Sequence, residues 1–445
     1  MPRAAGSRRC SLCRGGRGYV YQSSWEQPVN KTVEPSLLDP DSYAAGCPHA
    51  RLAELRDAGA LSWQPGAFDP NLSNPEVSGG WFVHRYDEVK SVLRDPATYS
   101  SRRGTAVLMD PRPASVEAMS NLLINMDPPA HSKYRRLVSA MFTPRRVEAL
   151  RPRVEAIAKE VIDKIAGKGV ADGIYDIAAP MPMRVIAELL GIPERGELLF
   201  EISNRMIGAV DVEPEVRAEM AMMGGAELHL LGQEMAREKR GADDGTLLAA
   251  FVNGTLEGVE GEQGGATDEE AGWFLLLMAV GGNETVRTAT AQAIRTLAEW
   301  EDQRDLLVSD LDRYIPAAAE EILRFRPPIR NIRRTANTGG EIGGQPIAEG
   351  EKVVCNFTAA THDPQMFDNP EVFDITREQP KTQLAFGFGE HYCLGANLAR
   401  MQLQVILREI YSRIPDIHPS GEIAHQPSPL ICGLLSMPVA FTPER

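Results

Sequence analysis

The distribution of apolar and polar residues along the chain favours helices. Residues 273–280 are apolar on every side, as in a buried helix, and the acidic residues 268–270 open that helix. From Leu394 to Val405, apolar residues recur at helical spacing and predict a second helix with one buried face. Residues 145–240 predict several more helices, which prolines separate.

Shorter elements are predicted in other parts of the chain. Residues 42–59 predict a helix that ends at a glycine, residues 80–86 a strand, and residues 87–93 a short helix. The chain is expected to become extended after Pro328, so that alternate residues share one face from there on.

The composition is that of a globular protein, with 43% hydrophobic and 24% charged residues in a chain of 445. A net charge of -14 argues against binding to nucleic acid. The six cysteines are scattered, unlike a secreted disulfide framework. No apolar run is long enough to span a bilayer, and no secretory signal or membrane anchor is recognised. We therefore expect a soluble, cytoplasmic bacterial protein.

The first 30 residues differ from the rest. They carry arginines among Gly, Ser and Cys without periodicity, and we expect a disordered basic tail there. Within it, Cys10 and Cys13 have the spacing of a metal-ligand pair, which Cys47 and His49 could complete. A second complete Cys-x-x-Cys pair is missing, so zinc is the weaker interpretation.

The densest chemical signal is the run Phe386-Gly387-Phe388-Gly389-Glu390-His391-Tyr392-Cys393-Leu394-Gly395. Its glycines let the backbone approach a bulky, flat group, and the helix that follows presents the Cys393 thiol at its N-terminus. The unpaired N–H groups and positive dipole end there favour a thiolate, and Gly395 lets the N–H groups approach the sulfur. The structural alternative is a core cysteine in a glycine-rich turn.

This pattern resembles the heme-binding loop of the cytochrome P450 family, and the resemblance covers nearly the whole chain. It implies a mainly α fold with small β-sheets, in which residues 31–445 form one domain. Heme b would lie between a long distal helix and the proximal helix that bears the cysteine. Cys393 would be the axial iron ligand, and Phe386, Gly387 and Gly395 would contact the heme.

The resemblance implies a monooxygenase reaction. One oxygen atom from O2 would enter a C–H bond of an apolar small molecule, either a steroid, a terpenoid or a lipid-like compound. A ferredoxin and a ferredoxin reductase would deliver NAD(P)H electrons, because no flavin or iron–sulfur domain is recognised. An acidic ferredoxin would dock on the cysteine side, with Lys133, Arg136 and Arg400 as candidate contacts. We expect a monomer.

Other activities stay open. The chain could act on an aromatic or polyketide natural product as a tailoring enzyme, or it could be a peroxide-driven or isomerising heme-thiolate enzyme. A non-catalytic heme-thiolate protein that binds a small ligand is the third alternative. Such functions belong to sites and are not decided by a fold.

A second motif, Gly281-Gly282-Asn283-Glu284-Thr285, interrupts the apolar helix. Each glycine in a helix interior costs about 1 kcal/mol relative to alanine, and close approach of a ligand would offset this cost. The resemblance implies that Gly281 and Gly282 leave room over the iron. It also implies that Thr285 hydrogen-bonds at the oxygen site while Glu284 passes protons from bulk water. Alternatively, Glu284 forms a structural salt bridge and Thr285 bonds a backbone carbonyl.

Two further sets of residues complete the resemblance. His131 and Arg135 lie four apart on a predicted helix and therefore share a face, which alone would be an ordinary solvated basic face. The resemblance makes them, with Arg334 and His391, the residues that bind the heme propionates. It also implies a structural network of buried charges, formed by Glu321, Arg324 and Arg377.

The substrate contacts are predicted more loosely. By strand parity Arg330 shares a face with Ile332 and Arg334 and would point into the cavity, where it could bind a carboxylate. Alternatively, Arg330 reaches water or a propionate. The other predicted substrate contacts are Leu277, Val280, Gly281, Ile329 and Leu434.

Overall fold

The long helix α10 (Asp268–Glu299) is the element against which much of the chain packs. In the computed structural model, which describes residues 35–66, 79–108, 117, 119–207, 214–255, 265–378 and 383–444, it contacts α6, α8, α12 and α14. Thr267 caps its N-terminus, because its hydroxyl accepts from Glu270 N while the Glu270 carboxylate accepts from Thr267 N at 2.7 Å. The helix predicted to open at residue 268 is confirmed. The predicted tail of residues 1–30 lies outside the described residues.

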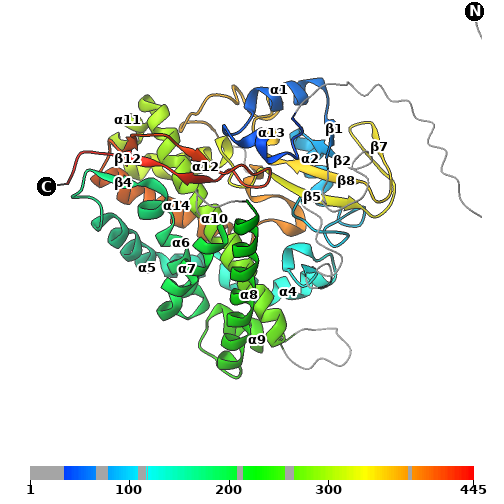
Figure 1. Cartoon of the computed structure of the whole chain (residues 1–445), viewed down its shortest axis with the longest axis horizontal. Helices are drawn as coiled ribbons and strands as arrows, with labels where there is room; N and C mark the ends of the chain where they lie inside the picture. Colours follow the sequence, from blue (N-terminus) through cyan, green and yellow to red (C-terminus); the bar gives the residue numbers. More distant parts are fainter. Residues whose placement is uncertain are drawn as a thin grey trace, which may run out of the picture. The chain divides into compact units, whose positions relative to one another are not determined.

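Helices form most of the described structure (Figure 1). Besides α10, the α-helices are α1 (His49–Ala58), α2 (Tyr86–Arg94), α4 (Ala130–Ser139), α5 (Pro144–Asp163), α6 (Pro180–Leu190), α7 (Gly196–Ile207), α8 (Pro214–Lys239), α9 (Leu247–Asn253), α11 (Glu301–Ser309), α12 (Leu311–Phe325), α13 (Phe357–Thr361) and α14 (Ala396–Arg413).

The strands form small sheets. They are β1 (Leu61–Pro65), β2 (Gly79–Val83), β3 (Tyr99–Ser100), β4 (Val170–Asp172), β5 (Asn331–Ala336), β6 (Gly340–Ile342), β7 (Gln345–Ile347), β8 (Lys352–Asn356), β9 (His418–Pro419), β10 (Ala424–His425), β11 (Leu434–Ser436) and β12 (Pro438–Ala440). The largest sheet has the order β1-β2-β8-β5-β3, in which only β2 and β8 run parallel. Smaller sheets pair β10 with β11, β6 with β7, and β12 with β4 and β9.

The short elements predicted near the N-terminus differ in extent. The predicted strand and short helix correspond to β2 and α2. The predicted helix over 42–59 is shorter, because the chain makes a 3-10 turn at Pro40–Tyr43 and α1 begins only at His49.

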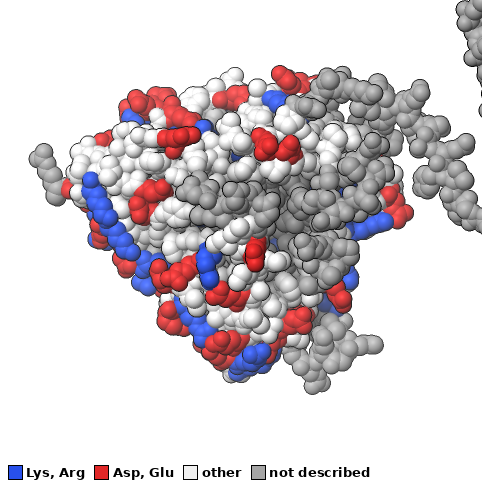
Figure 2. Space-filling view, viewed as in Figure 1, with Lys and Arg blue, Asp and Glu red and all other residues white. Residues whose placement is uncertain are grey.

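The distribution of charged side chains and the hydropathy of the helices are those of a globular protein. Acidic and basic side chains are interspersed on the face seen in Figure 2. None of the described helices is both long and apolar enough to cross a membrane.

Candidate active site

One mainly apolar cavity brings most of the predicted site residues together. It lies where α10, α4, β5 and the loop before α14 meet. The predicted residues that line it are His131, Arg135, Leu277, Gly281, Gly282, Thr285, Ile329, Arg334, Phe386, Gly387, His391, Cys393 and Gly395. They come from segments up to 264 residues apart in the sequence (131 to 395).

Three predicted substrate contacts are not among the residues that line this cavity. On α10, 43% of the Val280 surface is exposed, and Leu434 is buried in the protein core. Arg330 precedes β5, so strand parity does not apply to it. Its guanidinium is buried over the Tyr43 ring and donates to the carbonyls of Ser428 and Ile431, away from the cavity.

The run that contains Cys393 forms a tight loop before α14. Gly387 and Gly389 both adopt a positive φ of 70°, which favours glycine. A Cβ at Gly389 would also lie 2.4 Å from the carbonyl oxygen of Leu93 at the end of α2. Cys393 N donates to Phe386 O at 2.9 Å, which closes the loop and points its cysteine to the cavity.

The expected effect on the Cys393 thiol is only partly present. The Gly395 N–H does hydrogen-bond to the sulfur, and with Arg135 and Arg400 it lowers the thiol pKa. Burial nevertheless outweighs these groups, so that the net pKa is raised and not lowered as predicted. A thiol that coordinates a metal is deprotonated outright, so burial does not prevent this cysteine from acting as a ligand.

Four residues that can carry positive charge face the same cavity. His131 and His391 stack with ring centroids 4.1 Å apart, and Arg135 donates to Tyr392 O at 2.6 Å. Arg334 lies on β5 and donates to its neighbour's carbonyl, while the adjacent Arg333 points to the opposite face of the sheet. The predicted shared face of His131 and Arg135 is confirmed, and the pair does not form a solvated surface.

The surroundings keep the two histidines neutral. Burial, followed by the charges of Arg135 and Arg334, lowers the pKa of His131 to about 4. Burial and the charge of Arg334 lower the pKa of His391 to about 2. His131 Nδ1 has no hydrogen-bond partner among the described residues. A buried cluster with two arginines and an unsatisfied imidazole is suited to an anionic group.

The two glycines of α10 play different parts. Gly281 has open space where a Cβ would stand, as expected for room above a ligand. A Cβ at Gly282 would lie 2.6 Å from Cδ1 of Ile186 on α6, so this glycine also permits close helix packing. Thr285 lines the cavity, and its hydroxyl donates to Gly281 O at 2.7 Å.

Glu284 is buried but points away from the cavity. Its carboxylate lies 4.0 Å from the guanidinium of Arg287, which in turn covers the Tyr175 ring. Burial raises the pKa of Glu284 despite the nearby Arg287 charge. The contacts of both Glu284 and Thr285 are therefore those of the structural alternative, and a catalytic role needs a change of partners.

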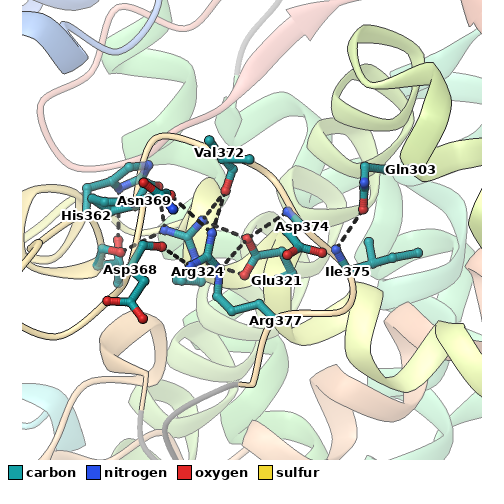
Figure 3. Close-up of polar contacts among 12 residues, drawn as sticks. Gln303, Glu321, Arg324, His362, Asp368, Asn369, Val372, Asp374, Ile375 and Arg377 are labelled. Atoms are coloured by element: carbon teal, nitrogen blue, oxygen red, sulfur yellow. Dashed lines mark hydrogen bonds and ion pairs between the residues drawn. The ribbon is translucent and has the colours of Figure 1, made fainter.

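The predicted network of buried charges is present and fully connected (Figure 3). Arg324 donates to both carboxylate oxygens of Glu321 at 2.7 and 2.8 Å, and Arg377 donates to the same carboxylate at 3.1 Å. The remaining donors of Arg324 bind three carbonyls, of Thr361, Pro370 and Val372. The network therefore fixes the chain between α13 and the cysteine loop.

Some functional positions were missed. Leu123, Ile124, Met278 and Ile332 add apolar surface to the cavity. Of these four residues, only Ile332 could have been predicted from the sequence, because alternate residues of a strand share a face and Ile332 lies two residues before Arg334. Arg400 was predicted to be a docking contact, but it pairs with Glu320 and covers the Phe386 ring.

Comparisons with known proteins agree with this geometry. Residues 233–413 match the family model described as cytochrome P450. A steroid C26-monooxygenase of Rhodococcus jostii is 33% identical over 412 residues, which cover 91% of this chain and 85% of the relative. A steroid C26-monooxygenase of Mycobacterium bovis is 32% identical and covers 89% of this chain and 92% of its own length.

Solved structures show the same fold. A Mycobacterium marinum cytochrome P450 in complex with pseudoionone has a TM-score of 0.81 at 31% identity, covering 93% of this chain and 99% of its own. The structure of P450BioI with an acyl carrier protein ligated to hexadec-9Z-enoic acid has a TM-score of 0.76 at 26% identity. This match covers 89% of this chain and 98% of the P450BioI chain. The predicted mainly helical fold is confirmed, and this chain belongs to the cytochrome P450 family of heme-thiolate monooxygenases.

Proposed function

We propose that the cavity holds heme b and that Cys393 would supply the thiolate that binds its iron. The observation that carries this proposal is that the Cys393 thiol, a helix with open space at Gly281 and a cluster of two arginines and two histidines all line one cavity. His131, Arg135, Arg334 and His391 would hold the propionates, and Phe386, Gly387, Gly395 and Gly282 would contact the ring. The unsatisfied Nδ1 of His131 fits a propionate oxygen as partner.

Bound heme supplies the oxygen-activating chemistry, in which O2, two electrons and two protons convert R–H to R–OH and water. The chain itself must bring both protons to the cavity. Thr285 can exchange the Gly281 carbonyl for a partner in the cavity at a cost of about 1 kcal/mol, the net worth of one hydrogen bond. Glu284 has a raised pKa and can hold a proton next to this threonine.

The role of Thr285 is tested by measuring product formed per NAD(P)H consumed. Thr285→Ala should lower this ratio at least tenfold, because NAD(P)H oxidation continues without controlled proton delivery. Thr285→Ser keeps the hydroxyl and should retain most of the coupling. Thr288→Ala, one turn further along α10 and buried outside the cavity, is the matched control. Equal coupling in the alanine and serine variants would refute the role.

The substrate that the cavity supports best is an apolar small molecule of the steroid, terpenoid or lipid class. Leu277, Met278, Ile329 and Ile332 give the cavity an apolar lining above the cysteine loop. Two relatives are named for steroid oxidation, and the related structures hold pseudoionone and a hexadecenoic acid group.

An optical titration tests the substrate class. The purified ferric protein is titrated with sterols, terpenoids, fatty acids and small aromatic or polyketide compounds. A compound that enters the cavity and displaces water shifts the Soret band towards its high-spin position. Leu277→Phe should weaken this binding at least tenfold, whereas Val280→Phe, which lies outside the cavity, should not. A saturable shift with polyketides alone would refute the steroid–terpenoid–lipid proposal.

Electrons reach a bacterial cytochrome P450 from separate redox partners. We propose a ferredoxin and its NAD(P)H-dependent reductase. Reconstitution with and without these two proteins tests this, and product formed from peroxide alone would contradict it. The candidate docking contacts are Lys133 and Arg136 on α4 and Arg400, which pairs with Glu320.

A further inference from the structure

A second group of ligand-type side chains lies outside the heme cavity. His49, at the first position of α1, meets His362, just after α13, and Glu371 in the following loop. One potential ligand atom from each of these three residues lies within 4.8 Å of the other two. None of the three lines the cavity.

The hydrogen bonding of His362 is that of a metal ligand. Its Nδ1 lies 2.9 Å from the carbonyl oxygen of Thr358, and a carbonyl can only accept, so Nδ1 carries the proton. Its Nε2 therefore presents a lone pair. This atom is buried, and no described group hydrogen-bonds to it. A histidine whose second nitrogen donates to a carbonyl is the usual arrangement around a bound metal.

The site is held in position from outside. Arg324 binds the carbonyl of Thr361, directly before His362, and the carbonyls on both sides of Glu371. Figure 3 shows His362 beside this network. Two of the three side chains are thus carried by backbone that a buried arginine fixes. Glu371 is half exposed, so its carboxylate can move inwards by the ångström or so that metal coordination requires.

We propose that His49, His362 and Glu371 bind a zinc ion, with water as the fourth ligand. Two neutral imidazoles and one carboxylate are a common zinc ligand set. Several arginines oppose a cation here: Arg326, Arg330 and Arg295 act on His49, and Arg324 acts on His362. Arg56 acts on both histidines, and its guanidinium lies 3.9 Å from Glu371. The ion would join α1 to the loop that the Arg324 network holds.

Zinc binding is measured on the full heme-loaded chain without a histidine tag. Cys10→Ser and Cys13→Ser are introduced throughout, so that this cysteine pair cannot contribute. After treatment with a chelator, zinc is titrated against a fluorescent chelator, and bound zinc and iron are counted by mass spectrometry. His49→Gln and Glu371→Gln are the test variants, and His418→Gln, an exposed histidine on β9, is the control.

We expect about one zinc per chain in the parent and the control, with a rise in melting temperature on zinc addition. His49→Gln and Glu371→Gln should weaken binding at least tenfold and abolish that rise, while the Soret band stays unchanged. His362→Gln should do the same. Because His362 is fully buried and its variant could fail to fold, the first two variants decide the test. Equal zinc binding in them, or no binding by the parent, would overturn the proposal.

Discussion

The buried pair of Glu284 and Arg287 allows a test that separates structure from catalysis. The two charges lie 4.0 Å apart without a hydrogen bond between the nearest atoms, and both side chains are almost inaccessible. At an effective dielectric constant of about 20, two charges at this distance attract by about 4 kcal/mol. Loss of either partner should therefore destabilise the protein, but by different routes.

Glu284→Gln leaves a guanidinium that cannot give up its charge. Breaking a buried pair in this way costs about 3–5 kcal/mol, reduced by the Tyr175 ring that Arg287 covers. Arg287→Met leaves a carboxyl group that can take up a proton, because burial already raises its pKa. The loss of stability in this variant cannot exceed the free energy needed to protonate the Glu284 carboxylate, whose pKa in the unfolded chain is 4.5. That free energy is about 3.4 kcal/mol at pH 7 and about 1.4 kcal/mol at pH 5.5.

The sign follows from proton binding. In Arg287→Met the folded state binds more protons than the unfolded state, so its stability relative to the parent rises as pH falls from 7 towards 4.5. Urea unfolding followed by circular dichroism should show a smaller Arg287→Met penalty at pH 5.5 than at pH 7, by at most about 2 kcal/mol. The Glu284→Gln penalty should not shrink, because glutamine does not titrate, whereas the raised pKa of Glu284 lets the parent gain stability as pH falls.

The double variant completes the cycle. Replacing both partners should restore most of the stability, since buried ion pairs exchange for neutral groups at little cost. If Glu284 also supplies protons, the stable double variant still forms less product per NAD(P)H. An Arg287→Met penalty that is the same at both pH values would refute the reasoning.

Three further predictions concern other parts of the molecule. Gly282→Ala places a Cβ 2.6 Å from Cδ1 of Ile186 and should cost about 1–3 kcal/mol in urea unfolding. Ile186→Val removes that atom and should recover most of the loss, and no recovery would contradict the packing account. Burial lowers the pKa of His84 to about 3, so the unfolded state binds its proton first and stability is lost as pH falls below 6.5. The loss should reach about 2 kcal/mol at pH 5, and His84→Gln should remove it, whereas an unchanged pH slope in this variant would count against the assignment. Arg330→Ala should lower the melting temperature, because two backbone carbonyls lose their donor, but it should leave the Soret titration unchanged. Weaker substrate binding without a stability change would restore Arg330 as a substrate contact.

The sequence predicted the residues whose chemistry is local. The cysteine run carries its own turn glycines and its own helix, so the loop geometry follows from neighbouring residues. The α10 segment is similar, because Thr267 and Glu270 cap it and its apolar run continues to the glycines. The charged network was implied by the family resemblance, and only its Glu321–Arg324 pair has a short spacing of its own.

Predicted and observed positions differ where a side chain's position depends on distant packing. Val280 and Leu277 are equally apolar and three residues apart, yet only Leu277 faces the cavity. Which face of α10 is inward depends on how α6 and α14 pack against it. The predicted direction of the Arg330 side chain differs from the observed one because β5 begins one residue later, at Asn331. The side chain instead packs over the ring of Tyr43, which lies 287 residues earlier in the sequence. The zinc group could not be predicted, because its three residues share no spacing.

The cluster of His131, Arg135, Arg334 and His391 in the cavity has a consequence for the synthesis of the protein. Its first members, His131 and Arg135, and its last, His391, are separated by about 256 residues of chain. At a synthesis rate of about 5–20 residues per second, roughly 13–50 seconds pass between their emergence from the ribosome. Four groups that favour an anion can surround one only after nearly the entire polypeptide has been translated. The apoprotein must therefore fold far enough to avoid aggregation before its prosthetic group can contact both of these parts of the chain.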